Sequence, residues 1–299
     1  MDLVDSVVDG ALDLHQHLGP SVLPRDLDVA EATIEAQEAG LKAITAKDHH
    51  VPTMALADLV QKHFVKKPGF KVFSGIALNN HIGGLNLEAL ETAINMGARF
   101  VWMPTVSTEN HHIKHTKGGL KFPTAKKVSA VQHEYIPLVK EDGSPTDDVL
   151  RVLEFVAQYQ QVVLSTGHGN AQEVDAIVKA AAGLGVKHII VNHPAYMIGA
   201  TIEQMKAWAK LGAYLEIGAA TSDPASKFCA VDMSTTLRII REVGVDHIIM
   251  NSDCGQLGNI RPVAAIKHFS RLLLDNGVTV RELETMLKTN PRTVMEMED

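Results

Sequence analysis

The stretch Leu184-Gly-Val-Lys-His-Ile-Ile-Val-Asn-His193 contains the unit from which the rest of the chain is built. Gly185 stands where a helix would end, because glycine readily adopts the left-handed conformation that closes helices. The run from Ile189 to Val191 is apolar and β-branched, which is typical of a strand that is buried on both faces. Asn192 and His193 then end the strand with polar side chains. A helix, a glycine, a buried strand and a polar strand end therefore follow one another in a fixed order.

This order recurs along the sequence, and segments of helical periodicity separate the apolar runs. Glycines at positions 40, 97, 212 and 244 stand, like Gly185, between a helix and the next strand. The apolar runs are Gly10 to His15, Leu41 to Lys47, Lys71 to Leu78, Arg99 to Met103, Gln161 to Thr166, His188 to Asn192, Ala213 to Ile217 and His247 to Asn251. Roughly eight parallel strands that alternate with helices predict an α/β fold, the (β/α)8 or TIM barrel, in which some distortion is allowed. We expect residues 1–299 to form a single domain.

The regular alternation breaks between Pro104 and Asp147. This part of the chain is rich in turn-forming residues, among them Gly118-Gly119 and the segment Asp142-Gly143-Ser144-Pro145. An insertion after the fourth strand would lie over the C-terminal mouth of a barrel, where active sites of this fold are built. We therefore predict that residues 105–147 form a lid or substrate loop. A surface excursion or a subunit contact is the alternative.

Composition limits the classes of function. The chain has 299 residues, 45% of them hydrophobic, and a net charge of -7 with a pI near 6.1. This charge gives no general attraction to nucleic acids or to anionic membranes, so we expect a small-molecule substrate and neither of those partners. Cys229 and Cys254 are too few for a disulfide framework, and the N-terminus has no basic segment leading into an apolar run. These features indicate a cytoplasmic protein, and they leave homo-oligomerisation open.

Polar residues that can bind metal ions stand at the ends of the predicted strands. In a parallel barrel these ends meet at one mouth, where the functional residues lie. His15 and His17 are two residues apart on a strand and point to the same face, so both imidazoles can reach one ion. A single histidine would more often be structural, but several at matching strand ends favour a metal site. The predicted ligands are His15, His17, His49, His168, His193 and Asp253.

Other polar residues have open interpretations. Lys47 could be a neutral amine that forms a carbamate or acts as a base, an ammonium that holds an anionic group, or a salt-bridge partner of Asp48. Asp48 could fix a histidine tautomer. Glu216 would face the barrel in only one of the two strand registers. We predict substrate contacts for histidines outside the ligand set, although loop histidines are often solvated. These are His50, His81, His111 and His112.

Together these strand ends resemble the metal-dependent amidohydrolase superfamily, including its phosphotriesterase-like members. The resemblance spans nearly the whole chain. It implies a TIM barrel with one or two divalent metal ions at its mouth. It also implies that His15, His17 and Asp253 hold one ion, while His168 and His193 hold a second ion or orient the substrate.

Two departures from that pattern concern the number of ions. Two-metal members usually bridge their ions with a carbamylated lysine or a glutamate from strand four, but here that strand ends Trp102-Met-Pro-Thr105. The segment Thr45-Ala-Lys-Asp-His-His50 instead resembles the polymerase-and-histidinol-phosphatase (PHP) family. That family has a glutamate where this chain has Gly75-Ile-Ala-Leu78, and a histidine near the position of Gln256. The resemblance to this second family is therefore partial.

The chemistry predicted from the sequence is metal-dependent hydrolysis. A zinc ion, or alternatively manganese or iron, would lower the pKa of a bound water and supply hydroxide. Asp253 would be the general base, His193 would polarise the scissile bond, and Lys47 would assist. We expect the substrate bond to be an amide, a cyclic amide, a lactone or an ester. The alternatives are a PHP-like phosphoesterase, a metal-dependent lyase or decarboxylase, and a non-catalytic metal-binding relative. No nucleotide-binding glycine motif follows a strand, so we expect no organic cofactor.

Overall fold

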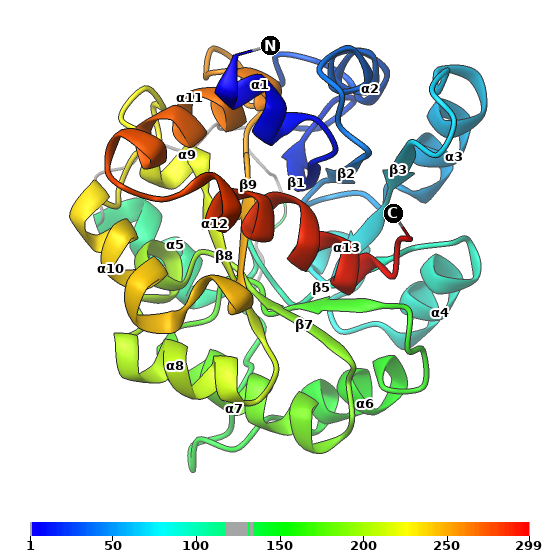
Figure 1. Cartoon of the computed structure of the whole chain (residues 1–299). Helices are drawn as coiled ribbons and strands as arrows, with labels where there is room; N and C mark the ends of the chain where they lie inside the picture. The colour runs from blue at the N-terminus through cyan, green and yellow to red at the C-terminus, as the bar shows by residue number, and fades with distance from the viewer. Residues whose placement is uncertain (1, 118–130, 132–133, 299) are drawn as a thin grey trace.

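A computed structural model describes residues 2–117, 131 and 134–298 of the chain. Its strands are β1 (Leu12–His17), β2 (Ala43–Lys47), β3 (Lys71–Phe73), β4 (Gly75–Ala77), β5 (Phe100–Trp102), β6 (Val163–Ser165), β7 (His188–Val191), β8 (Tyr214–Gly218) and β9 (Ile248–Asn251). Every pairing between neighbouring strands is parallel. The strands gather at the centre of the molecule, and the helices surround them (Figure 1). This arrangement confirms the predicted α/β barrel.

The helices follow the strands in the predicted alternation. They are α1 (Leu3–Val8), α2 (Val29–Glu38), α3 (Met54–His63), α4 (Leu87–Asn95), α5 (Glu109–Lys117), α6 (Asp147–Val156), α7 (Ala171–Gly183), α8 (Ile202–Lys210), α9 (Ala219–Ser222), α10 (Met233–Val243), α11 (Pro262–Asp275), α12 (Val280–Glu284) and α13 (Asn290–Met295). Many begin at a polar cap, as α7 does at Asn170, whose side chain accepts hydrogen bonds from the first turn. The five glycines expected at helix ends all have positive φ angles, between 80° and 92°. Among the described residues, no helix is long and apolar enough to cross a membrane.

The predicted third strand, Lys71 to Leu78, is divided at Ser74 into β3 and β4. β3 pairs with β2 and β4 pairs with β5, so the sheet is described as a three-stranded and a six-stranded part. At the division, the Gly75 amide donates to the Thr53 hydroxyl, 3.0 Å away, instead of continuing a ladder with β2. A side-chain bond has thus replaced a backbone bond. Sequence periodicity carries no signal for such a replacement.

The barrel is also irregular where its first and last strands meet. Between Asp13 and Gln16, β1 spans one residue more than the facing part of β2, which makes a bulge. Beside it, the β1–β9 junction has one parallel bridge between Gln16 and Cys254. Backbone bonds from Asp253 to His15 (2.9 Å) and from His17 to Cys254 (2.8 Å) complete the junction. The irregular seam therefore lies directly at the predicted ligands.

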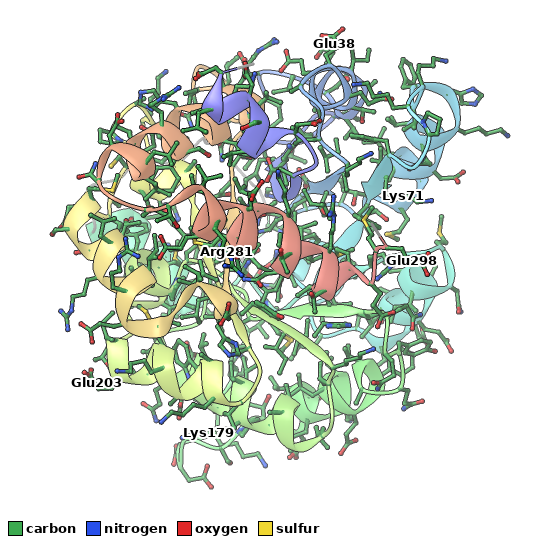
Figure 2. The ribbon with its side chains drawn as sticks, in the orientation of Figure 1. Glu38, Lys71, Lys179, Glu203, Arg281 and Glu298 are labelled. Carbon is green, nitrogen blue, oxygen red and sulfur yellow. The ribbon has the colours of Figure 1, made fainter. Side chains whose placement is uncertain are left out.

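Apolar side chains fill the inside of the barrel. Residues from eight strands, including Leu14, Phe100, Trp102 and Ile249, form one buried cluster with Val294 and Met295 of α13. α12 and α13 cross in front of the strands in Figure 1 and so cover one end of the barrel. Because the C-terminal helix closes this end, polar chemistry is left to the opposite mouth. Charged side chains of both signs project outward around the molecule, among them Glu38 and Lys179 (Figure 2).

The predicted insertion is described in two parts. After β5 the chain forms α5, and residues 134–146 return to α6 through a tight turn in which Val139 bridges to Pro145. Residues 118–130 and 132–133, which make up the middle of the predicted lid, lie outside the described residues. The lid therefore stays a prediction.

Candidate metal centre

Five histidine rings meet at the C-terminal mouth of the barrel. His15 and His17 come from β1, His49 follows β2, and His168 and His193 follow β6 and β7. The distance between ring centroids is 5.1 Å for His15–His17, 4.8 Å for His17–His49 and 5.3 Å for His15–His193. His168 lies 5.7 Å from His49 and 5.5 Å from His193. The structure thus brings together all of the predicted histidine ligands.

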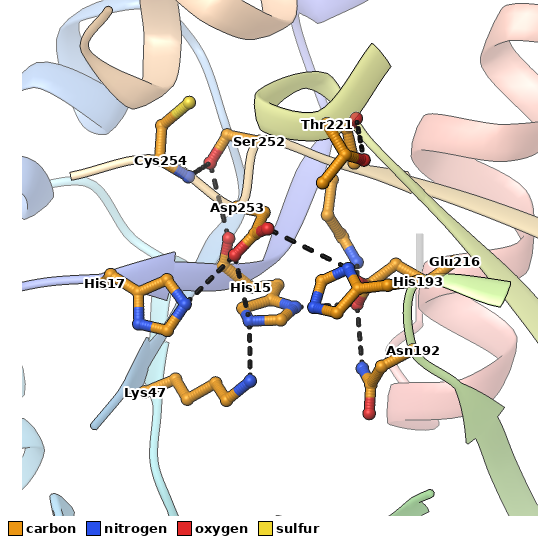
Figure 3. A network of polar contacts seen from close by, with 12 residues as sticks. His15, His17, Lys47, Asn192, His193, Glu216, Thr221, Ser252, Asp253 and Cys254 are labelled. Atoms are coloured by element: carbon orange, nitrogen blue, oxygen red, sulfur yellow. Dashed lines mark hydrogen bonds and ion pairs between the residues drawn. The ribbon is translucent and has the colours of Figure 1, made fainter. Parts of the chain in front are cut away.

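Asp253 lies next to three of these rings, those of His15, His17 and His193 (Figure 3). Its Oδ1 atom is 3.0 Å from His17 Nε2 and 3.3 Å from His15 Nε2, and its Oδ2 atom is 3.8 Å from His193 Nδ1. The ligand atoms of His15, His193 and Asp253 all lie within 4.8 Å of one another. Three buried groups of the types that bind transition metals therefore converge on one point.

Two of these residues adopt unusual backbone conformations. His193 and Asp253 have φ angles of 46° and 52°, in the left-handed region that residues with a Cβ seldom enter. Such conformations persist where the surrounding structure holds them, and they gather at functional sites. Gly255 helps to make the turn after Asp253, because a Cβ at this position would lie 2.1 Å from the His17 carbonyl oxygen. The local backbone is thus shaped around the predicted ligands.

Glu216 of β8 lies next to two of the predicted ligands, His15 and His193. Its Oε2 atom accepts a hydrogen bond from His15 Nδ1 (2.8 Å), and its Oε1 atom lies 3.2 Å from His193 Nδ1. The side-chain amides of Asn192 and Asn251 also donate to Oε2. Because a carboxylate accepts at Nδ1, the His15 Nε2 atom keeps its lone pair for an ion. The inward register is therefore the one that β8 adopts.

Burial decides the charge states at the mouth. It lowers the pKa values of His17, His49 and His168 well below the usual histidine range, so these rings are neutral at neutral pH. Burial alone would raise the pKa of Glu216, but the attraction of His15 and His193 and the hydrogen bond from His15 outweigh it and lower the value to about 2. Neutral imidazoles beside ionised carboxylates are the states that bind a cation.

Lys47 points into the same group from β2 (Figure 3). Its Nζ atom lies 2.9 Å from His15 Nε2 and 5.4 Å from the centre of the Trp102 ring, and the residue is 1% exposed. Burial lowers its pKa to about 8, although the Asp253 and Glu216 carboxylates act in the opposite direction. An amine at the lone pair of His15 stands where a cation would bind. The salt bridge with Asp48 that the sequence left open is not among the ion pairs of the described residues.

Helix α5 contacts the mouth of the barrel through His111. His111 of α5 stacks on His168, with centroids 4.9 Å apart, and their Nδ1 atoms lie 2.7 Å apart. His49 Nδ1 is 2.9 Å from the Thr105 hydroxyl, which also accepts from the Asn79 amide. His111 therefore reaches the predicted ligands, as expected of a residue from the insertion.

The remaining predicted substrate residues lie further out. The His50 and His81 rings meet edge to face with centroids 4.4 Å apart, and His50 Nδ1 is 3.5 Å from Asp48 Oδ1. His112 is exposed and lies 5.5 Å from the ring of Tyr135. None of the three is among the described residues that line the hollow at the mouth. Their roles in substrate binding stay predictions.

A hollow opens over the histidines and contains about 520 Å³ of space between the protein atoms, part of it open to solvent. Histidines and Asp253 form its floor, and apolar side chains such as Met197 and Phe228 form much of its wall. Arg25 also lines it, with its side chain 4% exposed. Arg25 is not among the site residues predicted from the sequence. It stands in a turn-rich loop rather than at a strand end, and no sequence pattern distinguishes it from a surface residue.

The residues at the mouth fit a divalent metal ion. Asp253 Oδ1 is near two imidazole nitrogens, yet it has no hydrogen-bond partner among the described residues, and neither does the buried His168 Nε2 atom. Ligand atoms that share one ion at about 2.0 to 2.2 Å lie roughly 3 to 3.5 Å apart, as Asp253 Oδ1 does from the Nε2 atoms of His15 and His17. His15, His17, His193 and Asp253 would hold the ion. A second ion would depend on His49 and His168.

A protein-family model matches most of the chain, including the five predicted histidine ligands but not Asp253. It matches residues 10–216, and it is described as a family of unknown function, DUF6282. The chain belongs to the DUF6282 family. A search of curated proteins found no match for this DUF6282 member.

Solved structures show which proteins share the fold of this DUF6282 chain. An amidohydrolase from Pseudomonas aeruginosa has a TM-score of 0.62 at 12% identity, and covers 99% of this chain and 97% of its own. The probable dipeptidase PvdM from the same organism has a TM-score of 0.67 at 10% identity, with 98% and 96% covered. A 2,6-dihydroxybenzoate decarboxylase from Rhizobium has a TM-score of 0.57 at 15% identity, with 96% and 99% covered. At these identities the likeness concerns the fold, and it agrees with the amidohydrolase resemblance of the sequence.

Proposed function

We propose that this protein is a metal-dependent hydrolase that cleaves an amide, cyclic amide, lactone or ester bond in a small molecule. The observation that carries the proposal is the convergence of His15, His17, His193 and Asp253 on one point beneath a hollow. A TIM barrel needs no buried polar cluster at its mouth in order to fold, and burial of these groups costs free energy unless they are paired or bind an ion. A fold shared with an amidohydrolase and a probable dipeptidase supports the same chemistry.

The bound ion would lower the pKa of a water molecule and stabilise the charge that develops on the attacked carbonyl oxygen. With Oδ1 of Asp253 on the ion, its Oδ2 atom, 3.8 Å from His193 Nδ1, would accept the proton of the attacking water and return it to the leaving group. Glu216, which accepts a hydrogen bond from His15 and lies 3.2 Å from His193 Nδ1, would orient both rings. His168 lines the hollow, where it would contact the substrate, and the amine of Lys47, 2.9 Å from His15 Nε2, would assist from within the group.

Decarboxylation is the second candidate. It is favoured by the fold shared with a 2,6-dihydroxybenzoate decarboxylase over 96% of this chain. Phosphoester hydrolysis of the PHP type rests on the strand-two resemblance, and an organophosphorus hydrolase from Deinococcus radiodurans shares the fold with a TM-score of 0.59 at 12% identity. It is less well supported, because Arg25 is the one lining residue of the described hollow that has a permanent positive charge.

The test is a screen of amides, lactones and aryl esters, aromatic carboxylates and aryl phosphates with the zinc- or manganese-loaded protein. We expect turnover of an amide, lactone or aryl ester. This turnover should be lost when the ion is chelated and should return when the ion is added back. An Asp253→Asn variant should fold but not turn over, since asparagine tolerates the left-handed backbone at this position. Release of carbon dioxide without hydrolysis would favour the second candidate. Turnover that survives chelation would contradict the proposal.

A further inference from the structure

Arg25 has a fixed position next to the metal centre. It belongs to the loop between β1 and α2, which is fastened at its base by the bridge between Gly19 and Asp28. Arg25 itself bridges to Gln256, and the Asp26 amide donates to the Gly255 carbonyl at 2.9 Å. The backbone of Arg25 is therefore bound to the segment that directly follows Asp253.

The guanidinium of Arg25 is buried, and some of its hydrogen-bond donors have no partner among the described residues. Its side chain is 4% exposed, and it lines the hollow together with His17 and Asp253. The Nε and Nη2 atoms have no hydrogen-bond partner among the described residues. The ion-pair partner is Asp48, whose Oδ2 atom lies 3.5 Å from Nη2, beyond the usual length of a charged hydrogen bond.

The negative charge of Asp48 balances the positive charge of Arg25, but the Asp48 oxygens accept their hydrogen bonds from other groups. Its Oδ2 atom accepts from the Ser21 hydroxyl, and its Oδ1 atom accepts from the backbone amides of His50 (2.7 Å) and Val51 (3.2 Å). A pair that served only to stabilise the fold would favour two parallel hydrogen bonds between guanidinium and carboxylate. Here the positive charge is balanced by Asp48, while the buried Nε and Nη2 groups have no hydrogen-bond partner among the described residues.

We propose that Arg25 binds a carboxylate group of the substrate and so directs the scissile bond to the centre formed by His15, His17 and Asp253. The planar guanidinium matches a carboxylate through two parallel hydrogen bonds, and a buried position strengthens them. One permanent positive charge beside the Asp253 carboxylate suits a monoanion better than a phosphate dianion. The apolar Leu23, Met197 and Phe228 in the same wall would contact the hydrocarbon part.

The substrate role of Arg25 rests on the proposed function, but the anion site can be tested without turnover. Binding of acetate, hexanoate and phenylacetate to the metal-free protein would be measured by calorimetry, with phenylacetamide as the neutral and phenyl phosphate as the dianionic counterpart of phenylacetate. We expect at least one carboxylate to bind, and phenylacetamide to bind about tenfold more weakly than phenylacetate or worse. The Arg25→Met variant should lose affinity for carboxylates by about the same factor.

Arg261→Met is the matched control. Arg261 starts α11 and pairs with Asp26 of the same loop and with Glu35, but it does not line the hollow, so carboxylate binding should stay unchanged. Since Arg25→Met leaves Asp48 buried without its counter-charge, the double variant Arg25→Met/Asp48→Asn tests the same loss in a balanced site.

Three results would overturn the proposal: no carboxylate binds, the variants bind carboxylates as the wild type does, or phenyl phosphate binds at least as tightly as phenylacetate. Because the protein is metal-free throughout, these results are independent of the hydrolysis screen. A failed screen with Arg25-dependent binding would reject the hydrolase and keep the anion site.

Discussion

Glu216 shows how a single residue can organise a site without binding the ion itself. It contacts His15 through one oxygen and lies near His193 through the other, so it links β1 and β7 across the barrel. Carboxylates in this position fix the tautomer and the orientation of histidine ligands. Two ligands from distant parts of the sequence thus depend on one side chain.

We expect Glu216→Gln to lower the affinity for zinc or manganese by about 10- to 100-fold. The amide keeps the size of the side chain but has one acceptor instead of two, and its NH2 group would face an imidazole nitrogen. Competition with a chromophoric chelator measures the change. The control is Glu242→Gln, which removes an exposed carboxylate paired with Arg238 on α10. Equal affinities of wild type and Glu216→Gln would contradict this role.

The residues of the site differ in how well the sequence predicts them. His15, His17, His168, His193 and Asp253 follow apolar strands, and the barrel rule places such positions at one mouth. Glu216 lies within a strand that is buried on both faces, so periodicity cannot decide which way it points. Arg25 has no local signal at all, because its burial depends on the loop bridging to Gln256.

At the scale of the elements, the turn after β9 is tightly constrained. Gly255 has a φ of 119°, and an added Cβ would lie 2.1 Å from the His17 carbonyl oxygen. This turn joins the irregular β1–β9 seam to Asp253. A change in the turn should therefore disturb both the fold and the centre.

We expect Gly255→Ala to destabilise the protein by roughly 2 to 4 kcal/mol, from backbone strain together with the steric overlap. Gly97→Ala is the control, since Gly97 has a φ of 91° but no atom within 4 Å of the added Cβ, and it should cost about 1 kcal/mol. Urea unfolding of both variants measures the difference. Equal costs would show that the close approach to His17 has no energetic weight.

The elements themselves follow closely from the sequence, with one instructive exception. Long apolar runs and glycine helix ends locate the strands because both reflect local backbone preferences. The division of the third run at Ser74 does not follow from local preferences, because it accompanies the hydrogen bond from the Gly75 amide to the hydroxyl of Thr53. Such a bond depends on tertiary structure.

At the scale of the whole molecule, burial of the histidines makes stability depend on pH. The native pKa values of His17, His49, His111 and His168 lie well below 6.5, so the native state binds fewer protons than the unfolded state. This stability is complete above about pH 6.5 and is lost as the pH falls. Glu216, with its pKa of about 2, adds a loss of the same sign below about pH 4.5. Asp13, whose pKa burial raises to about 6, acts in the opposite direction, but it is a single group.

We therefore predict that the free energy of unfolding of the metal-free protein decreases from pH 7 to pH 5 by several kcal/mol. Urea titrations at a series of pH values measure it. The His49→Gln variant should show a shallower decrease, because glutamine removes a group that binds a proton in the unfolded state but not in the native state. A stability that is constant between pH 7 and pH 5 would contradict the buried neutral histidines.

The central claim is that the mouth of the barrel is a metal centre, and the metal content of the purified protein tests it most directly. After dialysis against zinc or manganese and removal of free ion, elemental analysis should find at least one ion per chain. His17→Asn should reduce the content while circular dichroism shows a preserved fold. A folded wild-type protein that retains no ion, or a His17→Asn variant that retains as much as the wild type, would contradict the account.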